Sequence, residues 1–132
     1  MLSVSSILLY SHPIHSGGTH LQRLVEEVVL RENIIIARQM DQVARILNHP
    51  LNSIVAAIIV ADNEQELQAL SILRDKLQRI PFILILPNQE KKMVTQAHSL
   101  RPRYLAYADG DLSDVRYVFK KIIGRVYRDY IN

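Results

Sequence analysis

Asp62 is the residue best placed for chemistry in this chain. It follows Ser53 to Ala61, a mostly apolar run that is typical of a strand buried inside a parallel sheet. A carboxylate at such a strand end could accept a phosphoryl group if neighbouring carboxylates held Mg²⁺, a cation that requires oxygen ligands. The first apolar run, Val4 to Tyr10, is followed instead by Ser11 and His12. We therefore predict no metal site in this chain.

Two other groups are also missing that a response-regulator receiver, which the order of these runs resembles, would be expected to carry. A hydroxyl after the fourth apolar run would sense the phosphoryl group, but the chain has Leu86 and Pro87 there. A lysine after the fifth run would neutralise the phosphoryl charge, but Tyr107 stands in that region. Because the charge would stay uncompensated, we expect Asp62 to be a helix cap or a solvated carboxylate. We assign no catalytic, cofactor-binding or metal-binding residue.

The composition indicates one cytoplasmic domain. A chain of 132 residues can bury a full core, so we predict a single domain spanning residues 1–132. The chain has no cysteine, which fits a reducing compartment. No apolar run approaches the roughly 20 residues that span a bilayer, and Met1 to Tyr10 lacks the basic start of a signal peptide. We expect no membrane partner.

The basic residues do not indicate nucleic-acid binding. The net charge of +3 comes from 16 basic and 13 acidic residues, and the basic ones cluster at Arg101 and Arg103 and from Arg116 to Arg128. Phosphate tracking needs such residues on one face together with a recognition motif. The second cluster lies opposite an apolar helical stripe, which is typical of a solvated helix face. We therefore predict no nucleic-acid partner.

Apolar patterning predicts alternating strands and helices. The predicted strands are Val4–Tyr10, Ile34–Ala37, Ile54–Ala61, Ile80–Leu86 and the short, edge-like Tyr104–Ala108. Apolar residues at helical spacing lie in Leu21–Val29, Val43–Leu47, Leu67–Leu77, Gln89–Leu100 and the tail, where Asp111 is the predicted N-cap. Parallel strands need crossover helices. The predicted fold is therefore an α/β, flavodoxin-like, receiver-like domain with a five-stranded, parallel, doubly wound sheet.

Two family resemblances follow from these elements. Their order is similar to that of a response-regulator receiver that has lost its phosphoryl-transfer residues. Three stretches also resemble the N-terminal, receiver-like wing domain of bacterial Orn/Lys/Arg decarboxylases, which use pyridoxal phosphate. These stretches are Val43–His49 with Ala57–Asp62, Ile80–Leu86, and Tyr104–Gly110 with the tail helix ending in Tyr127–Asn132.

The decarboxylase resemblance implies a non-catalytic N-terminal domain that assembles and regulates a larger enzyme. Its partners would be its own catalytic core and like subunits of a homo-oligomer. Pyridoxal phosphate is implied for that core alone, because the family's Ser-x-His-Lys type motif is absent here and His98 is followed by Ser99. In some members a wing arginine contacts a nucleotide between subunits, and Arg101 lies near the corresponding place. The alternative is a degenerate pseudo-receiver that acts by protein–protein interaction without phosphorylation.

Surface contact is the function that both resemblances imply. Receiver-like folds commonly pair through the face made by the fourth helix, the fifth strand and the fifth helix. Tyrosine and arginine are enriched at interface hot spots. The predicted interaction surface consists of Arg103, Tyr104, Tyr107, Arg116, Tyr117 and Arg128. Tyr127 either joins it or packs on the sheet, as its place on the apolar stripe allows.

Overall fold

The computed structural model describes residues 5–12, 18–50 and 53–131. Its five strands are β1 (Ser5–Tyr10), β2 (Ile34–Ala37), β3 (Ser53–Val60), β4 (Phe82–Leu86) and β5 (Tyr104–Tyr107). They form one sheet in the order β2-β1-β3-β4-β5, and every neighbouring pair is parallel. This architecture confirms the predicted parallel, receiver-like fold.

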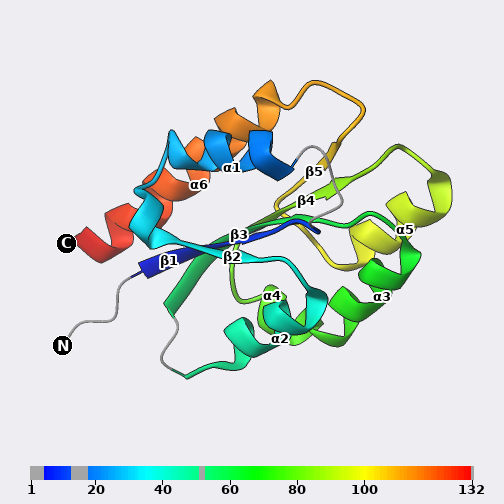
Figure 1. Cartoon of the computed structure of the whole chain (residues 1–132), viewed down its shortest axis with the longest axis horizontal. Helices are drawn as coiled ribbons and strands as arrows, with labels where there is room; N and C mark the ends of the chain where they lie inside the picture. Colours follow the sequence, from blue (N-terminus) through cyan, green and yellow to red (C-terminus); the bar gives the residue numbers. More distant parts are fainter. Residues whose placement is uncertain (1–4, 13–17, 51–52, 132) are drawn as a thin grey trace.

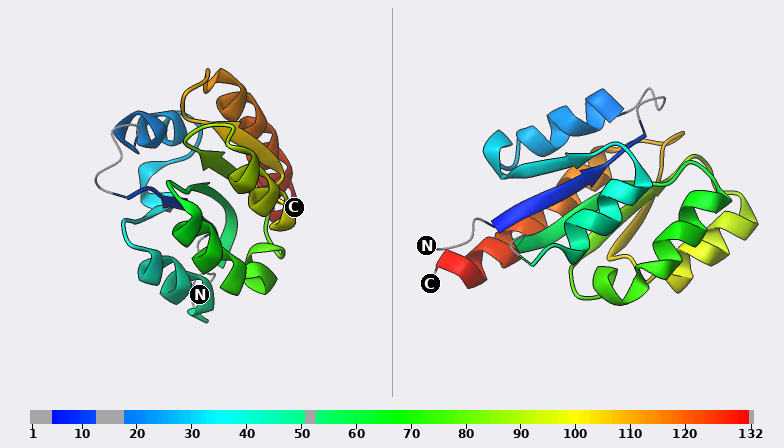
Figure 2. Two further views of the ribbon diagram at one scale, coloured as in Figure 1. Left: turned by 90° about the vertical axis from the view of Figure 1, so that its right-hand side faces the viewer. Right: turned by 60° about the horizontal axis from the view of Figure 1, so that its bottom comes forward.

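Helices cover both faces of the sheet. They are α1 (Gly18–Glu26), α2 (Met40–Asn48), α3 (Glu64–Ile72), α4 (Arg74–Leu77), α5 (Lys91–Ser99) and α6 (Ser113–Ile131), with a short 3-10 turn, η1 (Arg31–Asn33). Helices α1 and α6 lie on one face and α2, α3, α4 and α5 on the other (Figures 1 and 2). Since a parallel crossover must pass over a face of the sheet, this arrangement gives the three layers of a doubly wound fold.

The strands are mostly apolar because both of their faces are covered. Along β1, Ile7 and Leu9 pack in the cluster beneath α1 and α6, whereas Leu8 and Tyr10 pack in the cluster beneath α2 to α5. Each of these four side chains is at most 2% exposed. Side chains of a strand point alternately to opposite faces, so the sheet separates two apolar cores.

The third predicted helix differs from the observed structure. The chain leaves the helical path at Leu73, whose backbone has φ −95° and ψ 11°, so two helices, α3 and α4, replace one. Leu77 is fully buried, whereas Ile72, which the sequence pattern places on the apolar stripe, is 86% exposed. Ile72 therefore does not belong to the buried stripe.

Most other boundaries shift by one or two residues. The fourth strand begins at Phe82 rather than Ile80, because Pro81 has no N–H for the sheet ladder. Asp111 accepts hydrogen bonds of 2.9 Å from both the backbone N–H and the hydroxyl of Ser113, the first residue of α6. It therefore caps the helix start as predicted, although the helix begins two positions later.

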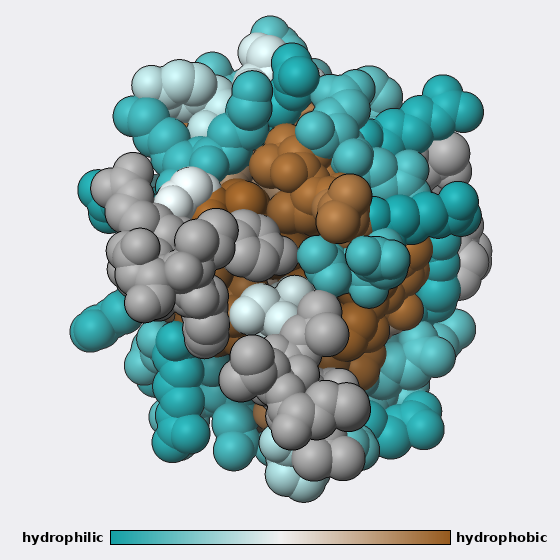
Figure 3. All heavy atoms as spheres, turned by 90° about the vertical axis from the view of Figure 1, so that its left-hand side faces the viewer, coloured by the Kyte–Doolittle hydropathy of each residue, from teal (hydrophilic) through white to brown (hydrophobic). Residues whose placement is uncertain are grey.

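The surface at the amino ends of the strands shows apolar side chains in its centre, surrounded by hydrophilic ones (Figure 3). Partly buried apolar residues that pack around the core beneath α1 and α6 include Val28, Ile34 and Val126. Among the described residues, no helix is long and apolar enough to cross a membrane.

Candidate functional site

Asp62 lies at the carboxyl edge of the sheet, where β3 leads into α3. Asn63 is the N-cap of α3, and its side-chain oxygen accepts a 2.9 Å hydrogen bond from the Glu66 N–H. The Glu66 side chain turns back, and its Oε1 accepts a 2.8 Å hydrogen bond from the Asp62 N–H. This reciprocal capping fixes the Glu66 carboxylate at the strand end.

Tyr10 makes the second contact of that carboxylate. It is the last residue of β1, its side chain is 1% exposed, and its hydroxyl donates a hydrogen bond to Glu66 Oε2. Burial raises the pKa of the Tyr10 hydroxyl above its ordinary value. The hydrogen bond to Glu66 and the charges of Glu66 and Asp62 raise this pKa further. We call Tyr10, Asp62 and Glu66 the strand-end lock.

The lock borders an open hollow of about 480 Å³, whose lining also includes His12, Met40 and Asn63. Among the described residues, no group of three His, Asp or Glu side chains is placed to hold a metal ion. The strand ends of β4 and β5 bring Leu86 and Tyr107 to this edge. None of the described residues that line the hollow is a lysine, serine or threonine, the types that would neutralise and sense a phosphoryl group.

Sequence reasoning missed Glu66, which is the central residue of the lock. A usable signal was present, because Asn63 and Glu66 stand at the spacing of a capping box. The hydrogen bond between Glu66 and Tyr10 has no comparable signal in the sequence, because the two residues are 56 positions apart.

The structure separates the residues of the predicted interaction surface. Tyr104 packs against the core beneath α1 and α6, whereas Tyr107 packs against the core beneath α2 to α5. Three positions apart on one strand, they face opposite sides of the sheet. Arg116 faces α1, where its Nε lies 3.1 Å from Glu27 Oε2. The side chain of Arg128 is outside the described part of α6.

Arg103 and Tyr104 do come together with α6. They line a hollow of about 590 Å³ together with Val118, Lys121, Ile122, Gly124 and Arg125. We call this hollow the β5–α6 groove. Tyr117 is 60% exposed beside it, with Lys121 Nζ 4.7 Å from the centre of its ring. The groove therefore combines an apolar floor, Tyr104 with Val118 and Ile122, and a cationic rim, Arg103 with Lys121 and Arg125.

Gly124 is unusual because it lies inside a 19-residue helix. Glycine in a helix interior costs about 1 kcal/mol relative to alanine. A Cβ placed on Gly124 would meet no atom within 4 Å among the described residues. The packing of the described chain thus does not require glycine at this position.

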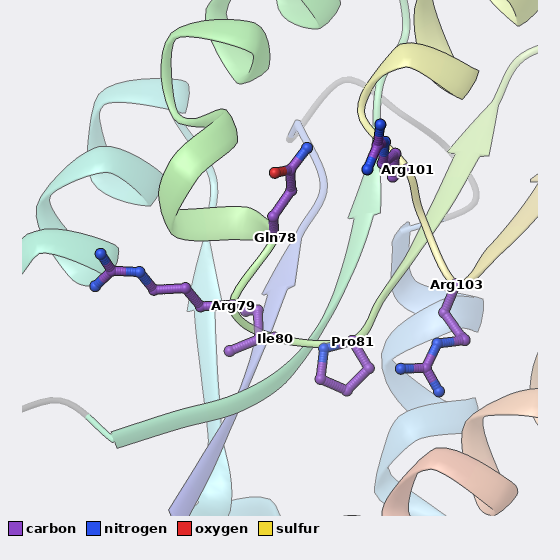
Figure 4. A pocket seen from close by; sticks show the side chains of 6 residues that line it. All are labelled: Gln78, Arg79, Ile80, Pro81, Arg101 and Arg103. Carbon is purple, nitrogen blue, oxygen red and sulfur yellow. The ribbon is translucent and has the colours of Figure 1, made fainter.

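Arg101 and Arg103 also border a second hollow, of about 310 Å³, at the amino ends of β4 and β5. Arg79 lines it too, but Arg79 and Arg103 extend to opposite sides of the paired loops (Figure 4). Arg101 follows α5 with φ 55°, a conformation that costs a non-glycine residue about 1 kcal/mol. The arginines therefore share this edge without converging on one point.

Comparisons with known proteins place the fold among receiver domains. No protein-family model matches the chain, and no curated protein matches it. A pilus assembly-related protein from Burkholderia pseudomallei superposes with a TM-score of 0.68, 15% identity and coverage of 92% of both chains.

Two response regulators superpose similarly. One, a two-component response regulator from Legionella pneumophila, has a TM-score of 0.66, 16% identity and coverage of 90% of this chain and 98% of its own. The other is a phosphorylated cyanobacterial phytochrome response regulator, with a TM-score of 0.58, 13% identity and coverage of 89% and 91%. These likenesses establish a receiver-like fold.

Proposed function

We propose that this chain is a receiver-like domain that acts by binding other proteins and not by accepting a phosphoryl group. The observation that carries this proposal is the strand-end lock. The carboxylate of Glu66 accepts hydrogen bonds from the Asp62 N–H and from the buried Tyr10 hydroxyl. The end of β3 is thereby occupied by a carboxylate of the chain itself.

The lock opposes phosphoryl transfer for an electrostatic reason. A phosphoryl group on Asp62 would add negative charge beside Glu66, and like charges at short range repel. The Asp62 N–H, a donor that could stabilise an incoming oxyanion, is already bonded to Glu66 Oε1 at 2.8 Å. If Asp62 is not phosphorylated, the domain can still act by binding other proteins through its surface.

The structural neighbours are consistent with this proposal. They include response regulators and also a protein named for pilus assembly. The same fold thus occurs in a protein whose name refers to assembly. For this chain, protein–protein interaction is the function that needs none of the missing catalytic groups.

Incubation with beryllofluoride and Mg²⁺ tests the proposal, with amide NMR as the readout and an active receiver domain as the positive control. We expect the control to respond and this chain to show no shifts centred on Asp62. Acetyl phosphate followed by intact-mass measurement should likewise give no adduct. A stable adduct on Asp62 would refute the proposal.

We propose a second, narrower candidate from the decarboxylase resemblance, namely the assembly domain of a pyridoxal-phosphate enzyme. The stretches that support it are Ile80–Leu86 and Tyr104–Gly110. The reading frame of the parent gene distinguishes the candidates. A proline linker followed by a pyridoxal-phosphate lysine motif would support the decarboxylase, and a DNA-binding or ATPase module would support the pseudo-receiver.

A further inference from the structure

Gly124 leaves open space on the surface of α6. Glycine weakens a helix interior, and no described atom lies close enough to exclude a side chain there. The same residue lines the β5–α6 groove. Close approach of a second backbone is a physical reason for glycine at such a position, because any Cβ would occupy the space that the second chain needs.

The rim of the groove carries positive charge. Arg103, Lys121 and Arg125 line it, and no carboxylate does so among the described residues. The ion pairs found within the described ranges all involve other cations. An acidic occupant would therefore find cationic groups that form no ion pair within the described ranges.

A second copy of this chain fits the groove poorly. In a two-fold symmetric pair the same patch faces itself. The rim of one copy would then lie against the same three cations of the other, and like charges repel. Charge complementarity thus favours a different, acidic partner.

The groove is bordered by the open edge of the sheet. Strand β5 is the last in the sheet order, so among the described residues one side of it has no neighbouring strand. The Ala108 N–H donates to the Leu86 carbonyl of β4 at 2.7 Å, and successive residues of a strand point their backbone groups in alternate directions. The N–H and C=O of Leu105 and Tyr107 therefore point outward, where an extended peptide can pair with them.

We propose that the β5–α6 groove binds an acidic, extended segment of a partner protein, with its backbone passing closest to Gly124. Backbone groups of the segment pair with β5 at Leu105. Its apolar side chains rest on Val118 and Ile122, and its carboxylates meet the cationic rim. This inference rests on the proposed function and adds the location and chemical class of the partner segment.

The test uses the full chain and a fluorescein-labelled synthetic peptide of alternating glutamate and valine, followed by anisotropy and amide NMR. A peptide with glutamine in place of glutamate serves as the uncharged control. We expect the acidic peptide to bind, to shift the amides of β5 and α6, and to bind more weakly as salt increases. The glutamine peptide should bind at least about tenfold more weakly.

Three variants locate the site. Lys121→Glu with Arg125→Glu should weaken binding at least about tenfold, whereas Arg74→Glu with Lys76→Glu makes the same change of charge on α4 and should leave binding unchanged. Gly124→Ala should raise the thermal midpoint, because alanine favours the helix, and should still weaken binding. Stabilisation together with lost binding separates a contact role from damage to the fold.

Other results would overturn the inference. These are equal binding by both peptides, equal effects of the two charge-reversed pairs, unchanged binding by Gly124→Ala, and tighter binding of a single-stranded oligonucleotide of equal charge. Self-association of the wild type that Lys121→Glu with Arg125→Glu abolishes would also overturn it, because the groove would then join two copies. A beryllofluoride adduct on Asp62 would refute only the proposed function, since the peptide assay does not depend on the strand end.

Discussion

Replacing Glu66 by alanine should expose how much the strand-end lock stabilises the domain. The change removes the acceptor of the buried Tyr10 hydroxyl and the cap of the Asp62 N–H. A buried donor without an acceptor costs about 1–3 kcal/mol, and loss of a helix-cap hydrogen bond costs about 1 kcal/mol. We therefore expect Glu66→Ala to lower the free energy of unfolding by about 2–4 kcal/mol.

Tyr10→Phe removes the donor and keeps the ring, so it should cost only about 1 kcal/mol. In the double variant no buried hydroxyl is left without a partner. The double variant should therefore be more stable than the sum of the two single effects predicts, by about 1–2 kcal/mol.

Urea unfolding of the four proteins measures this coupling. Glu64→Ala is the matched control, because Glu64 lies in the same helical turn and its 3.4 Å ion pair with Lys92 is exposed. That control should change stability by less than about 0.5 kcal/mol. Additivity of Glu66→Ala and Tyr10→Phe within about 0.5 kcal/mol would refute the lock.

Three other changes test separate parts of the structure. The pKa of Tyr10 is higher in the folded than in the unfolded chain, so the hydroxyl's contribution to stability is fully present below about pH 10 and is lost as pH rises. In urea unfolding, the stability of wild type relative to Tyr10→Phe should therefore fall above about pH 10. Hydrogen bonds from the N–H and the hydroxyl of Ser113 lower the pKa of Asp111, so the carboxylate's contribution to stability is present above about pH 4 and is lost in acid. The difference in free energy of unfolding between wild type and Asp111→Ala should therefore shrink as pH falls through that range. Phe119 is a fully buried residue of α6 that packs in the core beneath this helix. In the same assay Phe119→Ala should lower the free energy of unfolding by about 3–5 kcal/mol. A small effect would show that α6 packs loosely on the sheet.

The sequence was sufficient to predict the layers of the fold because burial leaves a local trace. A strand covered on both faces, such as Phe82–Leu86, must be apolar at every position, and its five residues are all buried. The break at Leu73 left no comparable trace, since the apolar spacing from Leu67 to Leu77 also fits one continuous helix.

The candidate site was predicted in outline only. The absence of acidic residues after β1 argues against metal chemistry at Asp62, and this stays a prediction. The role of Glu66 was not predicted, because it depends on a tyrosine from another strand. The interaction surface was predicted from residue type and from the face through which receiver-like folds commonly pair. Side-chain direction along β5 then separates Tyr104 from Tyr107, and pairing with Glu27 holds Arg116 beside α1.

The division of the interior into two cores has a consequence for coupling between the lock and the groove. Tyr10 of the lock belongs to the core beneath α2 to α5, whereas Tyr104, which floors the groove, packs with the opposite core. Residues that share no packing partners contribute to stability almost independently. Changes at the lock should then leave the free energy of binding at the groove unchanged. The affinity of a partner for the groove would then not depend on the state of the lock, so the domain would not transmit a change from the lock to the groove.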